Sequence, residues 1–247
     1  MVAREVLSGS NYVALWRMWR LYPRFRENLG RYFLGRGEYP YDCQVRTPVG
    51  LEAPTLYSTH DMWTMNEVFC RQDYGADPGA RVVVDIGSNI GISALFFLTS
   101  SSCRCWLFEP VPRNVERLRR NLSAYEDRFE LRPLAVAEAS GRVEFGVEDS
   151  GRYGGIRVET GRSVEVACVG INNVLEEVLD LAPAVDILKI DTEGTELELL
   201  RAIRPELLRR VRTAYLEVER RPESAPEAFD STFRNQTWVL CNRALSL

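Results

Sequence analysis

A short hydrophobic run followed by a glycine loop constrains the fold of this 247-residue chain more than any other feature. Residues 82–86 are apolar apart from Asp85, which is typical of a strand buried on both faces of a parallel sheet. Gly87 and Gly91 bracket the next loop and allow a tight turn there. Residues 92–98 continue as an apolar helix. This strand–loop–helix unit predicts an α/β fold with a ligand site at the carboxyl end of the strand.

Further strands and helices alternate after this unit. Strands are predicted at 105–108, 129–136, 141–147, 185–190, 214–218 and 238–242. Helices are predicted at 114–122, 174–181 and 196–203. The alternation indicates a doubly wound, mainly parallel sheet with helices on both faces and right-handed crossovers. We expect this Rossmann-like domain to cover residues 57–247.

Residues 1–56 are expected to form an N-terminal helical cap on the substrate side. Residues 11–22 and 25–33 have helical periodicity and are divided by Pro23. One face of the first helix carries Tyr12, Leu15, Trp16, Trp19 and Tyr22, and the other carries Arg17, Arg20 and Arg24. This aromatic face packs on the main domain in one interpretation. In the other, the basic amphipathic helices contact membrane lipid or an acidic carrier protein.

The charge of the chain is uneven. The net charge is −4 and the pI is about 5.4, which argues against a general nucleic-acid binder. Residues 1–36 hold seven arginines and two glutamates, a net +5, which leaves −9 in the rest. Lys189 is the only lysine and His60 is the only histidine. Any chemistry that requires a histidine must therefore use His60.

The six cysteines and the hydropathy pattern bear on location. Cys103 and Cys105 are too close in sequence for the usual zinc spacing, so we expect free thiols in a reducing compartment. No apolar run approaches the roughly 18 residues needed to span a bilayer. The segment 12–21 contains two arginines and lacks a small-residue cleavage site. We therefore predict a cytoplasmic protein.

Asp85 indicates the charge of the ligand. Its carboxylate would repel a pyrophosphate but suit a ligand with an ammonium or sulfonium centre. The glycines are spaced G-x-x-x-G rather than G-x-G-x-x-G, the dinucleotide fingerprint. Both features favour S-adenosylmethionine over NAD. Glu109, which follows the next strand 18 residues beyond Gly91, is placed to accept hydrogen bonds from ribose hydroxyls.

A second acidic segment follows the strand at 185–190. Lys189 and Asp191 point the same way, because side chains on a strand alternate. A Lys–Asp pair, with Glu193 and Glu196 at a helix N-terminus, is the structural interpretation. Buried charges are costly unless they are paired or functional, so the pair at this strand end also indicates a site.

Four segments together resemble the FkbM-type methyltransferases. They are 85–91 (DIGSNIG), 108–110 (FEP), Ala135-Val136 before Gly141, and 188–194 (LKIDTEG). The resemblance covers about residues 57–220. It implies a class I methyltransferase fold of seven strands, one of them antiparallel, and methyl transfer from S-adenosylmethionine to a hydroxyl of a sugar or natural product. The cofactor-binding residues expected on this basis are Asp85, Gly87, Ser88, Asn89, Gly91, Glu109, Pro110, Ala135, Val136, Asp191 and Glu193.

The catalytic assignments are left open among a few residues. Asp191, Glu193 and His60 are the candidates for the base that removes the acceptor proton. Lys189 would orient Asp191 or lower the pKa of the acceptor. We expect a small hydroxylated acceptor, no metal and no nucleic-acid partner, and a homodimer is compatible with the sequence. The alternatives are an NAD(P)-dependent oxidoreductase and a non-catalytic Rossmann-like binding module.

Overall fold

The hydrophobic run at 82–86 forms β5 (Val82–Ile86), an interior strand of a seven-stranded sheet. The computed structural model describes residues 9–147, 154–156 and 163–245. The sheet order is β14-β15-β13-β12-β5-β6-β7. The other strands are β6 (Arg104–Phe108), β7 (Phe129–Arg132), β12 (Val185–Ile190), β13 (Val211–Glu217), β14 (Phe229–Arg234) and β15 (Thr237–Asn242). β15 runs antiparallel to both of its neighbours, whereas the pairings from β13 to β7 are parallel.

The strand order reverses beside β5. From β5 the chain adds β6 and then β7 on one side, and it later adds β12 and β13 on the other. The carboxyl ends of β5 and β12 therefore flank a topological switch point, where open α/β sheets bind ligands. The predicted fold class, a seven-stranded and mostly parallel sheet with one antiparallel strand, is confirmed.

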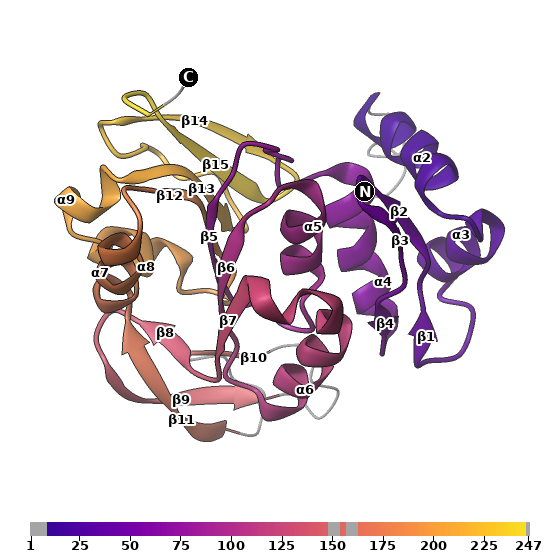
Figure 1. Cartoon of the computed structure of the whole chain (residues 1–247), viewed down its shortest axis with the longest axis horizontal. Helices are drawn as coiled ribbons and strands as arrows, with labels where there is room; N and C mark the ends of the chain where they lie inside the picture. Colours follow the sequence, from indigo (N-terminus) through magenta and orange to yellow (C-terminus); the bar gives the residue numbers. More distant parts are fainter. Residues whose placement is uncertain (1–8, 148–153, 157–162, 246–247) are drawn as a thin grey trace.

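Helices cover both faces of the sheet (Figure 1). One face carries α5 (Ile92–Ser100), α6 (Pro112–Asn121) and the short 3₁₀ helix η2 (Ser123–Arg128). The other carries α7 (Ile171–Leu181), α8 (Glu196–Ala202) and α9 (Pro205–Leu208). Val83 belongs to the first hydrophobic core, and Val84 and Ile86 belong to the second. Each such buried side chain contributes about 1.5–3 kcal/mol, which explains why the four residues of β5 other than Asp85 are apolar.

A second sheet lies beyond the end of the main one (Figure 1). Its order is β10-β9-β11-β8, formed by β8 (Ala135–Ala137), β9 (Gly141–Val147), β10 (Gly154–Ile156) and β11 (Ser163–Gly170). The single strand predicted at 129–136 is therefore wrong, because β7 ends at Arg132 and β8 pairs with β11 instead. Pro133 lies in this break, where its missing N–H and fixed φ suit a chain that leaves one sheet for another.

The N-terminal segment combines helices with small hairpins. It contains α2 (Gly9–Leu21), α3 (Phe25–Leu34), β1 (Tyr41–Asp42), β2 (Val45–Thr47), β3 (Gly50–Glu52) and β4 (Thr55–Leu56). α4 (Thr59–Asn66) and the π-helical turn η1 (Glu67–Arg71) follow. Met18, Tyr22 and Leu56 share one hydrophobic core with Val83 and Leu107 of the main sheet. The predicted boundary between residues 56 and 57 stays a prediction.

Of the two interpretations of α2, the one that packs its aromatic face on the main domain is wrong. Ala14, Met18 and Tyr22 are buried, whereas Trp16 and Trp19 are 52% and 64% exposed. Arg17 turns inward, because its guanidinium donates hydrogen bonds to the carbonyl oxygens of residues 70 and 71 at 3.1 and 3.3 Å. The aromatic face therefore does not pack on the main domain, apart from Tyr22.

Two further sequence predictions concern cysteines and membrane spans. All six cysteines are free thiols, and only Cys241 is exposed. Across the ranges that the structure describes, every helix is too short or too polar to cross a bilayer.

Candidate active site

The turn after β5 is closed so tightly that only glycine fits at its first position. Gly87 has a φ of +78°, and a Cβ built on it would lie 1.8 Å from the carbonyl oxygen of Asp191. The amides of Gly87 and Ser88 both donate to the carbonyl oxygen of Phe108 at 3.0 Å. The amide of Asp191 donates to the carbonyl oxygen of Ile86 at 3.1 Å. The ends of β5, β6 and β12 are thus joined at one point.

Glu109 fixes the rest of the glycine loop. Its side chain accepts hydrogen bonds from the backbone amides of Asn89 and Val111, both at 3.0 Å, and from Asn114 Nδ2 at 3.3 Å. Asn89 has a left-handed φ of 47°, which this bond helps to hold. Burial raises the pKa of Glu109 to about 7, although the hydrogen bonds lower it. Glu109 therefore joins the end of β6 to the loop after β5.

Gly91 ends this loop and precedes α5. Its φ is +87°, and a Cβ there would lie 3.1 Å from Leu118 Cγ and 3.3 Å from the Leu122 side chain. The glycine thus allows α6 and the residue after it to pack directly beneath the start of α5. Both glycines that the sequence singled out are required by close approach as well as by backbone conformation.

Lys189 lies at the centre of a buried ion network. Its Nζ is 3.1 Å from Asp85 Oδ1 and 3.2 Å from Asp191 Oδ2, and it donates to the carbonyl oxygen of Gly87 at 3.0 Å. Asp85 also accepts a hydrogen bond from Ser93 Oγ at 2.6 Å. Burial lowers the pKa of Lys189, but Asp191 and Asp85 outweigh it and raise the pKa overall. Lys189 thus stays an ammonium that lies within 3.2 Å of oxygen atoms of Asp85, Asp191 and Gly87.

Asp191 also faces a carboxyl group that the sequence analysis missed. Glu217 ends β13, and its pKa is raised to about 9 by the charge of Asp191 and then by burial. Glu217 is therefore protonated at neutral pH and hydrogen-bonds to Asp191. The pKa of Glu67 is also raised, first by burial, with contributions from Asp73 and Asp191. In the sequence, Glu217 is visible only as a single acidic residue at the end of a predicted strand. Its proximity to Asp191 follows from the pairing of β12 with β13, which the sequence does not show.

The loop after β12 is held by a second buried carboxylate. Glu196 is 4% exposed and accepts hydrogen bonds from the amides of Thr192 at 2.8 Å and Gly194 at 3.0 Å. Glu193 between them has a left-handed φ of 59°. The predicted structural role of Glu196 at the start of α8 is thus visible in its contacts. Glu193 lines the cavity described next.

A cavity of about 860 Å³ opens at the switch point. It brings together seven of the predicted site residues: His60, Gly87, Ser88, Asn89, Lys189, Asp191 and Glu193. Nine acidic residues line it against two arginines and one lysine. Asp85 lies beneath it, paired with Lys189. The lining does not include Gly91, Glu109, Pro110, Ala135 or Val136.

The two predicted cofactor residues of β8 lie in a different setting. Ala135 and Val136 are buried and pair with Cys168 and Val169 of β11 in the second sheet. Ala135 packs against Cys168 in a small core. Pro110 follows Glu109 at the end of β6 and is half-buried. The role of these residues in cofactor binding stays a prediction.

His60 reaches the cavity from the N-terminal side. It belongs to α4, whose N-cap residue is Ser58. Ser58 Oγ accepts a hydrogen bond from the backbone amide of Asp61 at 3.2 Å. The His60 ring lies edge-on to Trp63, with 4.4 Å between ring centroids. Both residues line the same cavity as Asp191. The two leading candidates for the base therefore share one space. The described residues hold no cluster of three or more metal-binding side chains.

The FkbM methyltransferase domain matches residues 85–237. The hexuronic acid methyltransferase AglP of Haloferax volcanii is 25% identical over 154 residues, which cover 60% of this chain and 63% of AglP. The AMB antimetabolite synthetase AmbE of Pseudomonas aeruginosa is 26% identical over 227 residues, covering 74% of this chain and 10% of AmbE. The chain thus spans less than two thirds of either relative.

Solved structures with a related chain path have low sequence identity. The SAH-bound methyltransferase PaMTH1 of Podospora anserina has a TM-score of 0.42 and 10% identity, covering 76% of this chain and 80% of its own. An RNA methyltransferase of Salinibacter ruber in complex with S-adenosyl-L-homocysteine has a TM-score of 0.36 and 15% identity, covering 67% and 80%. The family match spans more than half of the chain and includes the glycine loop, Lys189 and Asp191. The chain therefore belongs to the FkbM methyltransferase family.

Proposed function

We propose that this protein transfers a methyl group from S-adenosylmethionine to a hydroxyl of a small polyhydroxylated acceptor, a sugar or a natural product. The observation that carries this proposal is the acidic, glycine-floored cavity at the ends of β5 and β12. A cavity with nine acidic residues and three cationic ones favours a ligand with a positive centre, such as a sulfonium. A dinucleotide pyrophosphate would be repelled by the same charges.

The residues present fit this donor. The Gly87 turn leaves no room for a Cβ and exposes the backbone of residues 87–89 to the cavity. Glu109 lies outside the lining of the cavity, but it accepts a hydrogen bond from the Asn89 amide at 3.0 Å and so fixes the loop that faces the donor. S-adenosylmethionine, when bound, supplies an electrophilic methyl carbon that leaves its sulfur as the new C–O bond forms.

Asp191 is the base in this proposal. Its side chain is 25% exposed and lines the cavity, so an acceptor hydroxyl can reach it. Lys189 holds one carboxylate oxygen at 3.2 Å, and protonated Glu217 hydrogen-bonds to the same group. The proton of the acceptor hydroxyl moves to the Asp191 carboxylate as the acceptor oxygen forms its bond to the methyl carbon. Lys189 and Glu217 position the base and do not touch the acceptor.

His60 is the second candidate for the base, since it lines the same cavity. Asp191 is favoured because buried Lys189 and half-buried Glu217 fix its side chain at the carboxyl end of β12, beside the glycine loop. Preorganisation of the reacting group is what lowers a barrier of this kind.

The acceptor class has support from one relative and from two cavity residues. AglP acts on a hexuronic acid. Arg201 and Arg220 are exposed and contribute two guanidinium groups to the lining of the cavity. A guanidinium binds a carboxylate through two parallel hydrogen bonds. We therefore propose a sugar acceptor, with its carboxylate, where it has one, held by these arginines.

Methyl transfer from isotope-labelled S-adenosylmethionine tests the proposal. The purified protein is incubated with hexoses, the matching hexuronic acids and phenolic acceptors, and products are read by mass spectrometry. We expect labelled methyl ethers of a sugar as products. In the Arg201→Gln variant, the rate of methyl transfer should fall more with hexuronic acids than with hexoses. Labelling of an amine or a nucleic acid instead would contradict hydroxyl transfer.

A further inference from the structure

α2 is apolar on two opposite faces, and the protein core uses only one of them. Ala14 and Met18 are buried within the core side. Tyr12, Trp16 and Trp19, at positions i, i+4 and i+7, are 61%, 52% and 64% exposed. Residues at this spacing form one stripe along a helix. A stripe with two exposed tryptophans is unusual for a surface that stays in water, since tryptophan favours sites with one apolar and one wet side.

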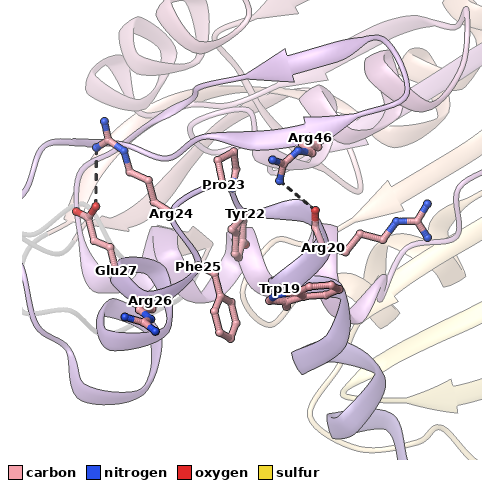
Figure 2. A pocket seen from close by; sticks show the side chains of 9 residues that line it. All are labelled: Trp19, Arg20, Tyr22, Pro23, Arg24, Phe25, Arg26, Glu27 and Arg46. Atoms are coloured by element: carbon pink, nitrogen blue, oxygen red, sulfur yellow. Dashed lines mark hydrogen bonds and ion pairs between the residues drawn. The ribbon is translucent and has the colours of Figure 1, made fainter.

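Arginines surround this stripe. The Arg20 guanidinium lies 5.4 Å from the Trp16 ring centroid. Figure 2 shows the rings of Trp19 and Phe25 projecting to the same side of a hollow, with arginine side chains spread on either side of them. This hollow, between the end of α2 and the start of α3, has a volume of about 750 Å³. The backbone there is fixed to the β2 strand, because Arg46 Nη1 donates to the Arg20 carbonyl oxygen at 3.2 Å.

The positive charge of this surface is barely neutralised. Glu27 is the acidic residue of the hollow's lining, and its carboxylate lies 3.8 Å from Arg24. Within the described residues, no carboxylate lies in ion-pair range of Arg20, Arg26 or Arg46, all of which are exposed. The first 36 residues carry +5 and the rest of the chain −9. An anionic surface would therefore attract this end of the molecule and repel the other.

We propose that this surface, formed by Tyr12, Trp16, Trp19, Arg20, Arg26 and Arg46, docks on an anionic lipid membrane. The aromatic stripe enters the headgroup region, where tryptophan and tyrosine rings are favoured. The arginines contact lipid phosphates. A membrane is favoured over an acidic protein because it supplies both the anionic phosphates and the boundary between apolar and wet regions that exposed tryptophans prefer. The proposal does not depend on the acceptor of the methyl group.

Vesicle co-sedimentation of the full chain tests this docking. Phosphatidylcholine vesicles with and without phosphatidylglycerol are compared at low and high salt. We expect binding to the anionic vesicles alone, weakened at high salt because the attraction is screened. R20Q/R26Q should weaken binding about tenfold or more, since two of the cations that attract the anionic surface are lost. W16S/W19S should weaken it to a similar degree.

Matched variants outside this surface serve as controls. R119Q/R120Q removes two exposed arginines of α6, and Leu181→Ser removes a side chain that is 71% exposed at the end of α7. Both should bind vesicles as the wild type does, and thermal unfolding checks that every variant is folded. Absence of binding to anionic vesicles, or an equal loss in the controls, would overturn the proposal. Self-association that W16S/W19S abolishes, without vesicle binding, would assign the surface to a second copy of the chain instead.

Discussion

The carbonyl oxygen of Asp191 occupies the place where a Cβ of residue 87 would stand, 1.8 Å from the ideal Cβ position on Gly87. This contact joins the loop after β5 to the loop after β12 and fixes where the Asp191 side chain begins. The floor of the cavity and the proposed base are therefore parts of one packed unit. A change at either position is expected to affect both.

Gly87→Ala should destabilise the protein strongly. The added methyl group would collide with backbone rather than with a flexible side chain, and the φ of +78° disfavours any L-residue. We expect a loss of about 3 kcal/mol or more in the free energy of unfolding, measured by urea denaturation. Gly30→Ala, in α3 with nothing within 4 Å of the added Cβ, is the control. It should be neutral or stabilise by up to about 1 kcal/mol, and equal effects of the two changes would contradict this account.

Lys189→Met should leave the fully buried Asp85 without its cation. Breaking one partner out of a buried pair costs about 3–5 kcal/mol, because the remaining charge is uncompensated. Asp85→Asn in the same chain should recover part of this loss, since no buried charge then remains unpaired beside Ser93. Chemical denaturation of the single and double variants measures both. A single variant within about 1 kcal/mol of the wild type would show that the network is not as buried as described.

Glu217 should make the protein less stable as the pH rises. In the folded state its pKa is about 9, against an ordinary value of 4.5, so between these values the folded protein holds a proton that the unfolded chain has released. The free energy of unfolding then falls with rising pH, by at most about 1.4 kcal/mol per unit for one proton. Glu217→Gln should remove this slope between about pH 4.5 and 9. Thermal unfolding at several pH values compares the wild type, Glu217→Gln and the exposed control Glu219→Gln. The assignment is refuted if stability depends on pH in the same way in all three proteins.

Asp191→Asn should abolish most turnover but preserve the fold. Removal of a general base typically costs about 10²–10⁴-fold in rate. His60→Gln should cost less than about tenfold if Asp191 is the base. Initial rates with labelled donor, and binding of S-adenosylhomocysteine to each variant, separate chemistry from affinity. The reverse order of the two effects would make His60 the base.

The interior strands β5, β6 and β12 were predictable because they are buried on both sides, whereas the edge strand β14, which alternates between buried or half-buried and exposed residues, was not predicted. Val83 and Val84 face different cores, so consecutive positions of β5 are apolar, and the glycine loop marks the end of this strand. The break after Arg132 was not predictable from periodicity, because the apolar pattern continues into Ala135-Val136. A second sheet outside the first decides where those residues pair.

The orientation of α2 illustrates a different limit. Periodicity identifies a stripe, but a helix that is apolar on two faces does not reveal which face is buried. In the structure Met18 is buried and Arg17 points inward, where its guanidinium donates hydrogen bonds to carbonyl oxygens of η1. Long-range backbone acceptors of this kind leave no local sequence pattern.

Only part of the proposed catalytic arrangement could be predicted from the sequence. Lys189 and Asp191 share one side of a strand by period two, so their pairing follows from the sequence. Glu217 joins them only because β13 lies beside β12 with Lys189 opposite Tyr215 and Ile190 opposite Leu216. Strand order and register are set by packing across the whole sheet, and no local spacing contains them.

Binding of S-adenosylmethionine and S-adenosylhomocysteine to the folded full-length chain, measured by isothermal titration calorimetry, tests the central claim most directly. The account predicts saturable binding of both compounds at one site, weakened at least tenfold by Glu109→Ala and unaffected by Leu181→Ser. NAD should produce no heat of binding. A folded sample that takes up neither compound, or that binds NAD instead, would contradict the proposed use of the cavity.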